Sequence, residues 1–254
     1  MVRALDHGRY WNPLTTAKID TGTRVLNVGT ADLAEGTGAP GQVLSATPEG
    51  LVVACGTGAV RLNRLTCQIR GGAVCPSTVA EAALPLLIAG QADELTAALA
   101  AVVPGEAALR RALKAMAPAA VPGATTGTAA ADWRSLSLSG DLPTLALAAA
   151  RAMALSDATL AFGGAGLPGY LSAWVPLPLA ARGSLSDARA ALDGALDTAR
   201  ASPAFPLDLM TRDPALQGIA PPQLALSDAA PVAGAVVTLT PMAMHYDAAR
   251  LSDA

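Results

Sequence analysis

Aromatic and metal-binding side chains are scarce in this chain. Phe, Trp and Tyr together make up 3% of the 254 residues, although hydrophobic residues make up 52%. A core built from such a sequence must rely on leucine, valine and alanine. The chain has two histidines, His7 and His245, and three cysteines, Cys55, Cys67 and Cys75. Because no two cysteines form a Cys-x-x-Cys pair, their spacing predicts neither a zinc site nor a disulfide framework.

Charge and long apolar runs are also limited. The net charge is −3 and the isoelectric point is about 5.3, a balance that favours neither nucleic acid nor an anionic membrane as partner. No uninterrupted apolar run reaches the roughly 18 residues of a membrane span. The segment Met1–His7 lacks the apolar core of a signal peptide. We therefore expect a cytoplasmic protein with reduced thiols, and its length allows two domains.

Residues 39–65 contain the clearest local pattern. Three short runs there are typical of β-strands, namely Gln42–Ala46, Gly50–Cys55 and Ala59–Leu65. The residues between them, Thr47-Pro48-Glu49 and Gly56-Thr57-Gly58, have turn chemistry. A further strand is expected at Thr23–Leu33. Strands rich in β-branched residues and separated by such short turns predict a small antiparallel β-barrel.

The same stretch resembles a known family. The runs "PGQVL" (residues 40–44) and "EGLVVACGTGAVRL" (residues 49–62) resemble the C-terminal, OB-like barrel domain of methionyl-tRNA formyltransferase-like proteins. Similar barrels occur in formyltransferase-like modules of some non-ribosomal peptide synthetases. The run "RALDHGRYWNPLTTAK" (Arg3–Lys18) resembles the segment that joins the catalytic domain to this barrel. The resemblance implies a barrel domain at residues 1–76, without the catalytic domain.

From residue 77 onward the periodicity predicts an α/β domain that extends to residue 254. Helices are expected at Gln91–Val103, Glu106–Met116, Thr144–Leu155 and Leu185–Ala201, and strands at Trp133–Leu138, Thr159–Gly163, Leu171–Leu179, Leu224–Leu226, Gly234–Thr240 and Ala243–Ala249. The helix at Thr144–Leu155 is apolar on nearly every side, which indicates that it is buried. Residues 117–131 are low in complexity and predict a flexible, exposed linker within this domain.

The order of these elements resembles a second family. The run "LPTLALAAARAMALSDATLAFG" (residues 142–163) resembles the buried helix and following strand in the C-lobe of non-ribosomal peptide synthetase condensation domains. The run "VVTLTPMAMHYDAARLSDA" (residues 236–254) resembles the strand that ends in that family's Tyr-Asp, here Tyr246 and Asp247. The resemblance covers residues 84–254. It implies a two-layer, chloramphenicol-acetyltransferase-like half-domain.

Both resemblances lack their catalytic parts. Neither histidine lies in the His-His-x-x-x-Asp-Gly run of condensation domains, and the formyltransferase active site belongs to an upstream domain. We therefore assign no catalytic, cofactor-binding or metal-binding residue, and expect a protein that is not an enzyme and needs no cofactor. The expected function is a scaffold within a peptide synthetase or hybrid megasynthase, preceding an adenylation domain. Its partners would be neighbouring adenylation or carrier domains, or a tailoring enzyme in trans.

Two alternatives remain open at this stage. The first is an acyl- or formyl-transfer accessory enzyme with a non-standard site, for which His245, near Asp247, is the first candidate. The second is nucleic-acid binding by the barrel, with Arg61, Arg64 and Arg70 as candidate contacts. The acidic isoelectric point and the scarcity of aromatic residues argue against the second alternative. A basic face on the helix at 106–116 is a candidate docking surface, formed by Arg110, Arg111 and Lys114.

Overall fold

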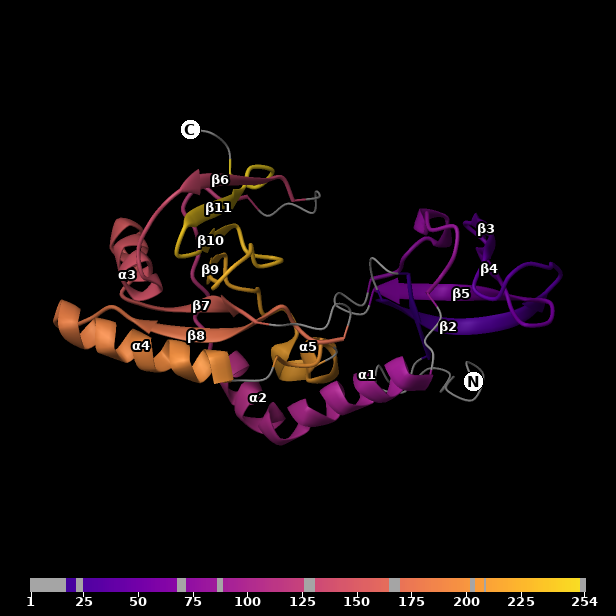
Figure 1. Ribbon diagram of the computed structural model, residues 1–254, viewed down its shortest axis with the longest axis horizontal. Coiled ribbons are helices and arrows are strands. Elements are labelled where there is room, and N and C mark those ends of the chain that lie inside the picture. The colour runs from indigo at the N-terminus through magenta and orange to yellow at the C-terminus, as the bar shows by residue number, and fades with distance from the viewer. Residues whose placement is uncertain are drawn as a thin grey trace. The chain divides into compact units, whose positions relative to one another are not determined.

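The computed structural model divides the chain into two compact units (Figure 1). Unit 1 comprises Met1–Ala101, Pro168–Leu171 and Pro206–Gln217, and unit 2 comprises Val102–Leu167, Ser172–Phe205 and Gly218–Ala254. The structure describes residues 17–21, 25–67, 72–85, 89–125, 131–164, 170–201, 204–207 and 209–251. The predicted division between domains at residue 76 stays a prediction.

Unit 1 contains a five-stranded antiparallel sheet. Its strands are β1 (Ala17–Asp20), β2 (Val25–Ala34), β3 (Val43–Thr47), β4 (Gly50–Ala54) and β5 (Ala59–Cys67). Their order across the sheet is β1-β2-β5-β4-β3. The predicted turns join β3 to β4 and β4 to β5, and the second turn closes with a hydrogen bond from the Cys55 amide to the Gly58 carbonyl. Strand β1 was not expected, because the sequence before residue 18 shows no clear alternation.

The expected closed barrel is wrong for the part of the chain that the structure describes. Strands β1 and β3 lie at opposite edges of an open sheet. The outer edge of β3 is occupied by a later segment: the Val43 amide donates to the Ala82 carbonyl, and the Leu84 amide donates to the Gly41 carbonyl. This pairing covers the start of the outer edge of β3, and within the described residues no ladder joins β3 to β1.

One face of this sheet carries the core of unit 1. The fully or almost fully buried members are Leu26, Val28, Leu51, Val53, Leu62, Leu65, Val79 and Leu84. On β2 and β4 they alternate with residues of the opposite face, as a sheet with one apolar side requires. On β5, Leu62 and Leu65 are three residues apart, and Arg64 between them has a φ of +52°. Unit 1 also contains the helices α1 (Ala89–Val102) and α5 (Leu209–Arg212), the first of which ends in unit 2. Two 3-10 turns, at Pro76–Thr78 and Pro214–Leu216, belong to it as well.

Unit 2 is a mixed sheet with helices, which confirms the mixed α/β class. The strands are β6 (Trp133–Ser137), β7 (Asp157–Gly163), β8 (Trp174–Ala180), β9 (Leu224–Leu226), β10 (Val237–Leu239) and β11 (Ala243–Asp247). Their order is β6-β11-β10-β9-β7-β8, in which β9 runs parallel to both of its neighbours and the other pairs are antiparallel. Strand β8 lies at an edge, where its two prolines are tolerated.

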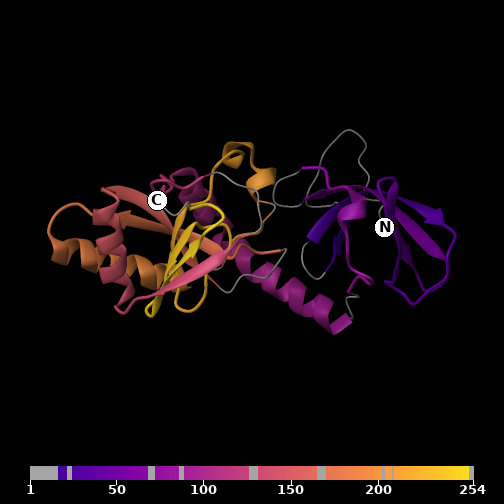
Figure 2. The ribbon, with the colours of Figure 1, turned by 90° about the horizontal axis from the view of Figure 1, so that it is seen from above.

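Two helices cover one face of this sheet (Figures 1 and 2). They are α3 (Leu142–Ala152) and α4 (Leu185–Ala201), and they contribute Leu142, Ala146, Leu147, Ala150, Ala188, Leu192, Leu196 and Ala199 to the main core. Each helix has a polar N-cap: the Asp141 carboxylate accepts from the Thr144 amide, and the Ser184 hydroxyl accepts from the Asp187 amide. A shorter helix after the 3-10 turn at Val103–Gly105, α2 (Glu106–Lys114), contacts β8.

The first part of the expected linker is built into unit 2. Ala119 is 1% exposed, its amide donates to the Thr159 carbonyl, and its carbonyl accepts from the Gln223 amide. Ala119 therefore lies between β7 and residue 223, just before β9, and joins the two by main-chain hydrogen bonds. The sequence pattern missed this because a run rich in alanine, proline and glycine is typical of linkers, and only its distant partners make it part of the sheet. Residues 126–130 of the expected linker lie outside the described residues.

Candidate functional site

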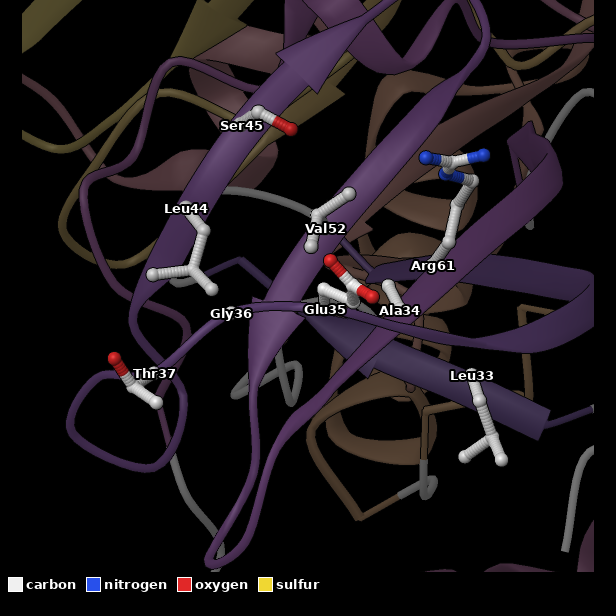
Figure 3. Close-up of a pocket in the computed structure, with 9 residues that line it drawn as sticks. All are labelled: Leu33, Ala34, Glu35, Gly36, Thr37, Leu44, Ser45, Val52 and Arg61. Atoms are coloured by element: carbon white, nitrogen blue, oxygen red, sulfur yellow. The ribbon is translucent and has the colours of Figure 1, made fainter.

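A hollow of about 660 Å³ lies on the first sheet, in unit 1 (Figure 3). Arg61 and Val52 line it and alternate in sequence with the core residues Leu62 and Leu51, so the hollow lies on the face opposite the core. The remaining lining residues are 33–37, Leu44 and Ser45. Figure 3 shows the Glu35 carboxylate beside Val52, while Leu33 extends away from the other side chains.

The segment after β2 forms one wall of this hollow because glycine allows it to pass close to β3. Gly36 has a φ of +148°, and a Cβ at this position would clash with the Leu44 side chain. A Cβ on Gly38 would lie 3.2 Å from Ala54 Cβ. The two glycines therefore let the chain pass close to the Leu44 and Ala54 side chains.

The charges around the hollow are mixed. Arg61 is exposed, as are Asp32, Glu35 and Glu49. A hydrogen bond from the Thr47 hydroxyl, the local backbone amide and the nearby Arg61 guanidinium together hold the pKa of Glu49 below its ordinary value of 4.5. A phosphate backbone would meet carboxylates as well as cations here. The residues proposed for nucleic-acid contact, Arg61 and Arg64, are both exposed on β5, whereas Arg70 lies outside the described residues.

A buried polar pair lies on the same face, further along the sheet. Asn27 on β2 and Thr66 on β5 are register partners. Asn27 is 1% exposed, and neither its amide atoms nor the Thr66 hydroxyl has a hydrogen-bond partner in the described structure. Sequence reasoning did not single out these residues, since both are common in strands and turns.

Unit 2 brings His245 next to a serine that sequence reasoning missed. Strands β6 and β11 pair so that Ser135 lies opposite His245, and Ser135 Oγ is 2.8 Å from His245 Nδ1. Asp247, the carboxylate considered as a partner for His245, is 2% exposed and accepts from the amides of Asp132 and Ala249 instead. The two partners are 110 residues apart, so no sequence spacing could have linked them.

The other residues considered from the sequence form no further constellation that the structure shows. His7 lies outside the described residues. Among the described residues, no group of three or more His, Cys, Asp or Glu side chains is arranged to hold a metal ion. On helix α2, Arg110 forms an ion pair with Glu106 at 2.7 Å, which leaves Arg111 as the exposed arginine of the expected basic face. Within the described part of the chain, no helix is long and apolar enough to span a membrane.

Comparison with known proteins identifies relatives for a quarter of the chain. No protein-family model matches it. A 64-residue segment is 50% identical to methionyl-tRNA formyltransferase from Pseudomonas syringae pv. tomato. A 47-residue segment is 57% identical to the enzyme of the same name from Ectopseudomonas mendocina. The first match covers 25% of this chain and 20% of the Pseudomonas syringae protein. The second match covers 18% of this chain and 14% of the Ectopseudomonas mendocina protein.

These matches confirm the formyltransferase resemblance and correct one expectation. The expectation that the chain is not an enzyme is wrong in the light of the comparisons, because the relatives it matches carry the name of an enzyme. The missing catalytic motifs had favoured the opposite conclusion, but a missing motif excludes only the chemistry of that motif. The chain spans about a fifth of the length of the curated relatives it matches.

Proposed function

We propose that this chain is a region of a formyl-transferring, multidomain enzyme of the cytoplasm, related in its first unit to the methionyl-tRNA formyltransferases. The observation that carries the proposal is the 50% identity over 64 residues to the Pseudomonas syringae protein. A segment of that length corresponds in size to residues 1–75, where the sequence resembles the C-terminal domain of that family. The five-stranded antiparallel sheet of unit 1 is compatible with such a domain.

In this proposal the multidomain enzyme is a non-ribosomal peptide synthetase or hybrid megasynthase. Three quarters of the chain lie outside the formyltransferase match, and unit 2 contributes a separate six-stranded sheet with its own core. The likeness of residues 84–254 to a condensation C-lobe supports a place ahead of an adenylation domain. The role proposed for unit 2 is to position the domain that presents the amine to be formylated.

The described charges on and around β5 favour a protein-bound acceptor over a tRNA. Arg61 and Arg64 are the exposed arginines of β5, and each phosphate neutralised by such a cation contributes about −0.9 to the slope of log K against log salt. These two arginines alone would give a slope of about −2, and the nearby carboxylates Asp32, Glu35 and Glu49 oppose even this. Binding to tRNA through this face should therefore be weak at physiological salt.

The test compares two acceptors on the full chain. The probes are an aminoacyl-loaded carrier domain of a peptide synthetase and methionyl-tRNA, each titrated by fluorescence anisotropy at several salt concentrations. We expect saturable binding of the carrier domain and little binding of tRNA. The control variants are Arg61→Gln and Arg64→Gln, which should leave carrier binding unchanged if unit 2 holds the carrier.

Either of two results would overturn this proposal. If neither probe binds, the chain has no acceptor-presenting role. If methionyl-tRNA binds with a steep salt dependence that the two arginine variants reduce, the chain acts on the same acceptor as its named relatives, and the carrier-bound acceptor is excluded.

A further inference from the structure

Strand β6 presents two serines on one face of the second sheet. Ser135 and Ser137 are two residues apart, so their side chains lie on the same side of the strand, and both are exposed. Their partners on β11 differ, because Ser135 lies opposite His245 and Ser137 lies opposite Ala243. The strand therefore carries one exposed serine opposite an imidazole and one exposed serine opposite an alanine.

The geometry of the first pair is that of a nucleophile and its base. Ser135 Oγ lies 2.8 Å from His245 Nδ1, within the range of a short hydrogen bond. When the neutral imidazole carries its proton on Nε2, Nδ1 accepts the hydroxyl proton. The imidazole is half-buried and the serine is exposed, so a reagent from solvent reaches Oγ while the ring is partly held by the sheet.

The described groups around Ser135 and His245 supply donors for a carbonyl oxygen but no carboxylate that orients the imidazole. Thr238, the register partner of His245 on β10, is 0% exposed, and its hydroxyl accepts from the Val232 amide. Asp247 is engaged by backbone amides, so it does not orient the imidazole as a third member. Because β6 is an edge strand in the described structure, alternate backbone N–H groups on its outer side have no ladder partner and are available as donors to a carbonyl oxygen.

We propose that Ser135, activated by His245, is a nucleophile toward activated acyl groups, with acyl thioesters as the chemical class of substrate. Oγ attacks the thioester carbonyl and forms the new C–O bond while Nδ1 takes the hydroxyl proton. The C–S bond then breaks, and the leaving thiolate receives that proton from the imidazolium as a free thiol. Attack of an amine or of water on the resulting seryl ester releases the acyl group and restores the serine hydroxyl.

This site is independent of the formyl acceptor proposed above. It lies on unit 2, on the sheet face opposite helices α3 and α4, because Ser135 and His245 alternate in sequence with residues such as Tyr246 that pack against the core. The formyltransferase match covers a quarter of the chain and assigns no role to either residue.

The decisive experiment uses Ser137 as an internal control in the unmodified protein. The full chain is treated with phenylmethylsulfonyl fluoride, which sulfonylates activated serines, and the modified peptide is sequenced by tandem mass spectrometry. General-base assistance contributes roughly a hundredfold or more to such a reaction. We therefore expect Ser135 to be labelled on the order of a hundredfold faster than Ser137.

Variants extend the test to the base and to the substrate class. His245→Gln should reduce labelling of Ser135 to the rate of Ser137, and Ser137→Ala should leave Ser135 labelling unchanged. An acetyl thioester should transfer its acetyl group to Ser135 in the unmodified chain and not in Ser135→Ala. Equal labelling of both serines, labelling of neither, or undiminished labelling in a folded His245→Gln protein overturns the proposal. If His245→Gln fails to fold, the comparison within the unmodified chain still decides.

Discussion

Replacing Leu147 with alanine should strongly destabilise unit 2. This residue lies on α3, is 3% exposed and belongs to the main core. The substitution removes three buried carbon atoms, each of which contributes about 0.8 kcal/mol by transfer from water. The residual cavity adds to this, so the free energy of unfolding should fall by about 3–4 kcal/mol. For a unit of this size each kcal/mol lowers Tm by roughly 3 °C, which predicts a shift of about 10 °C.

The matched control is Leu145→Ala on the same helix. Leu145 is half-buried and packs beside Gly140, so its truncation should cost about half as much or less. Urea unfolding followed by tryptophan fluorescence reports mainly on unit 2, because it holds two of the three tryptophans, Trp133 and the buried Trp174. The reasoning would be refuted by a change under about 1 kcal/mol for Leu147→Ala, or by equal changes in the two variants, since either result means that this face of α3 does not pack on the sheet.

Three further substitutions test local features of the two units. Gly36→Ala should destabilise unit 1, because Gly36 has a φ of +148° and the new Cβ would clash with Leu44. Gly56→Ala should be nearly neutral, because no described atom lies within 4 Å of the new Cβ. Parallel thermal melts of the two variants check this. Asn27→Val should raise the stability of unit 1 by about 1–2 kcal/mol, because it removes a buried amide that has no partner in the described structure. A loss of stability in urea unfolding would mean that the Asn27 amide forms hydrogen bonds in the folded protein. Hydrogen bonds from the first turn of α3 lower the pKa of Asp141 below its ordinary value of 3.8. The stabilising effect of this carboxylate is therefore present above about pH 4 and is lost as the pH falls through the folded-state pKa. The difference in Tm between the wild type and Asp141→Ala should shrink over that pH window.

Most elements of the fold could be predicted from local sequence. Helix α4 and strand β9 have the expected bounds: a periodic leucine stripe indicates the helix, and a short apolar run between turn residues indicates the strand. The caps of α3 and α4, Asp141 and Ser184, are local features of the same kind, since a helix start depends on a few adjacent residues.

Features that depend on distant partners were missed. The first sheet is open in the described residues, and residues 82–84 pair with residues 41–43 at the start of β3, a contact between segments about 40 residues apart in sequence that no alternation pattern reports. The burial of Ala119 depends on Thr159 and Gln223, which lie far along the chain. In both cases the local sequence allows several outcomes, and tertiary pairing selects one of them.

The pairing of Ser135 with His245 shows how strictly strand register determines chemistry in unit 2. A slip of one residue between β6 and β11 would place His245 opposite Arg134 or Leu136, whose side chains point to the other face. Register here is held by the backbone at both ends of the pair: the Ala248 amide donates to the Asp132 carbonyl, and the Leu138 amide donates to the Met242 carbonyl. The contact between hydroxyl and imidazole is therefore a consequence of sheet geometry rather than of adjacent sequence, and a chain scanned only for motifs would lose it.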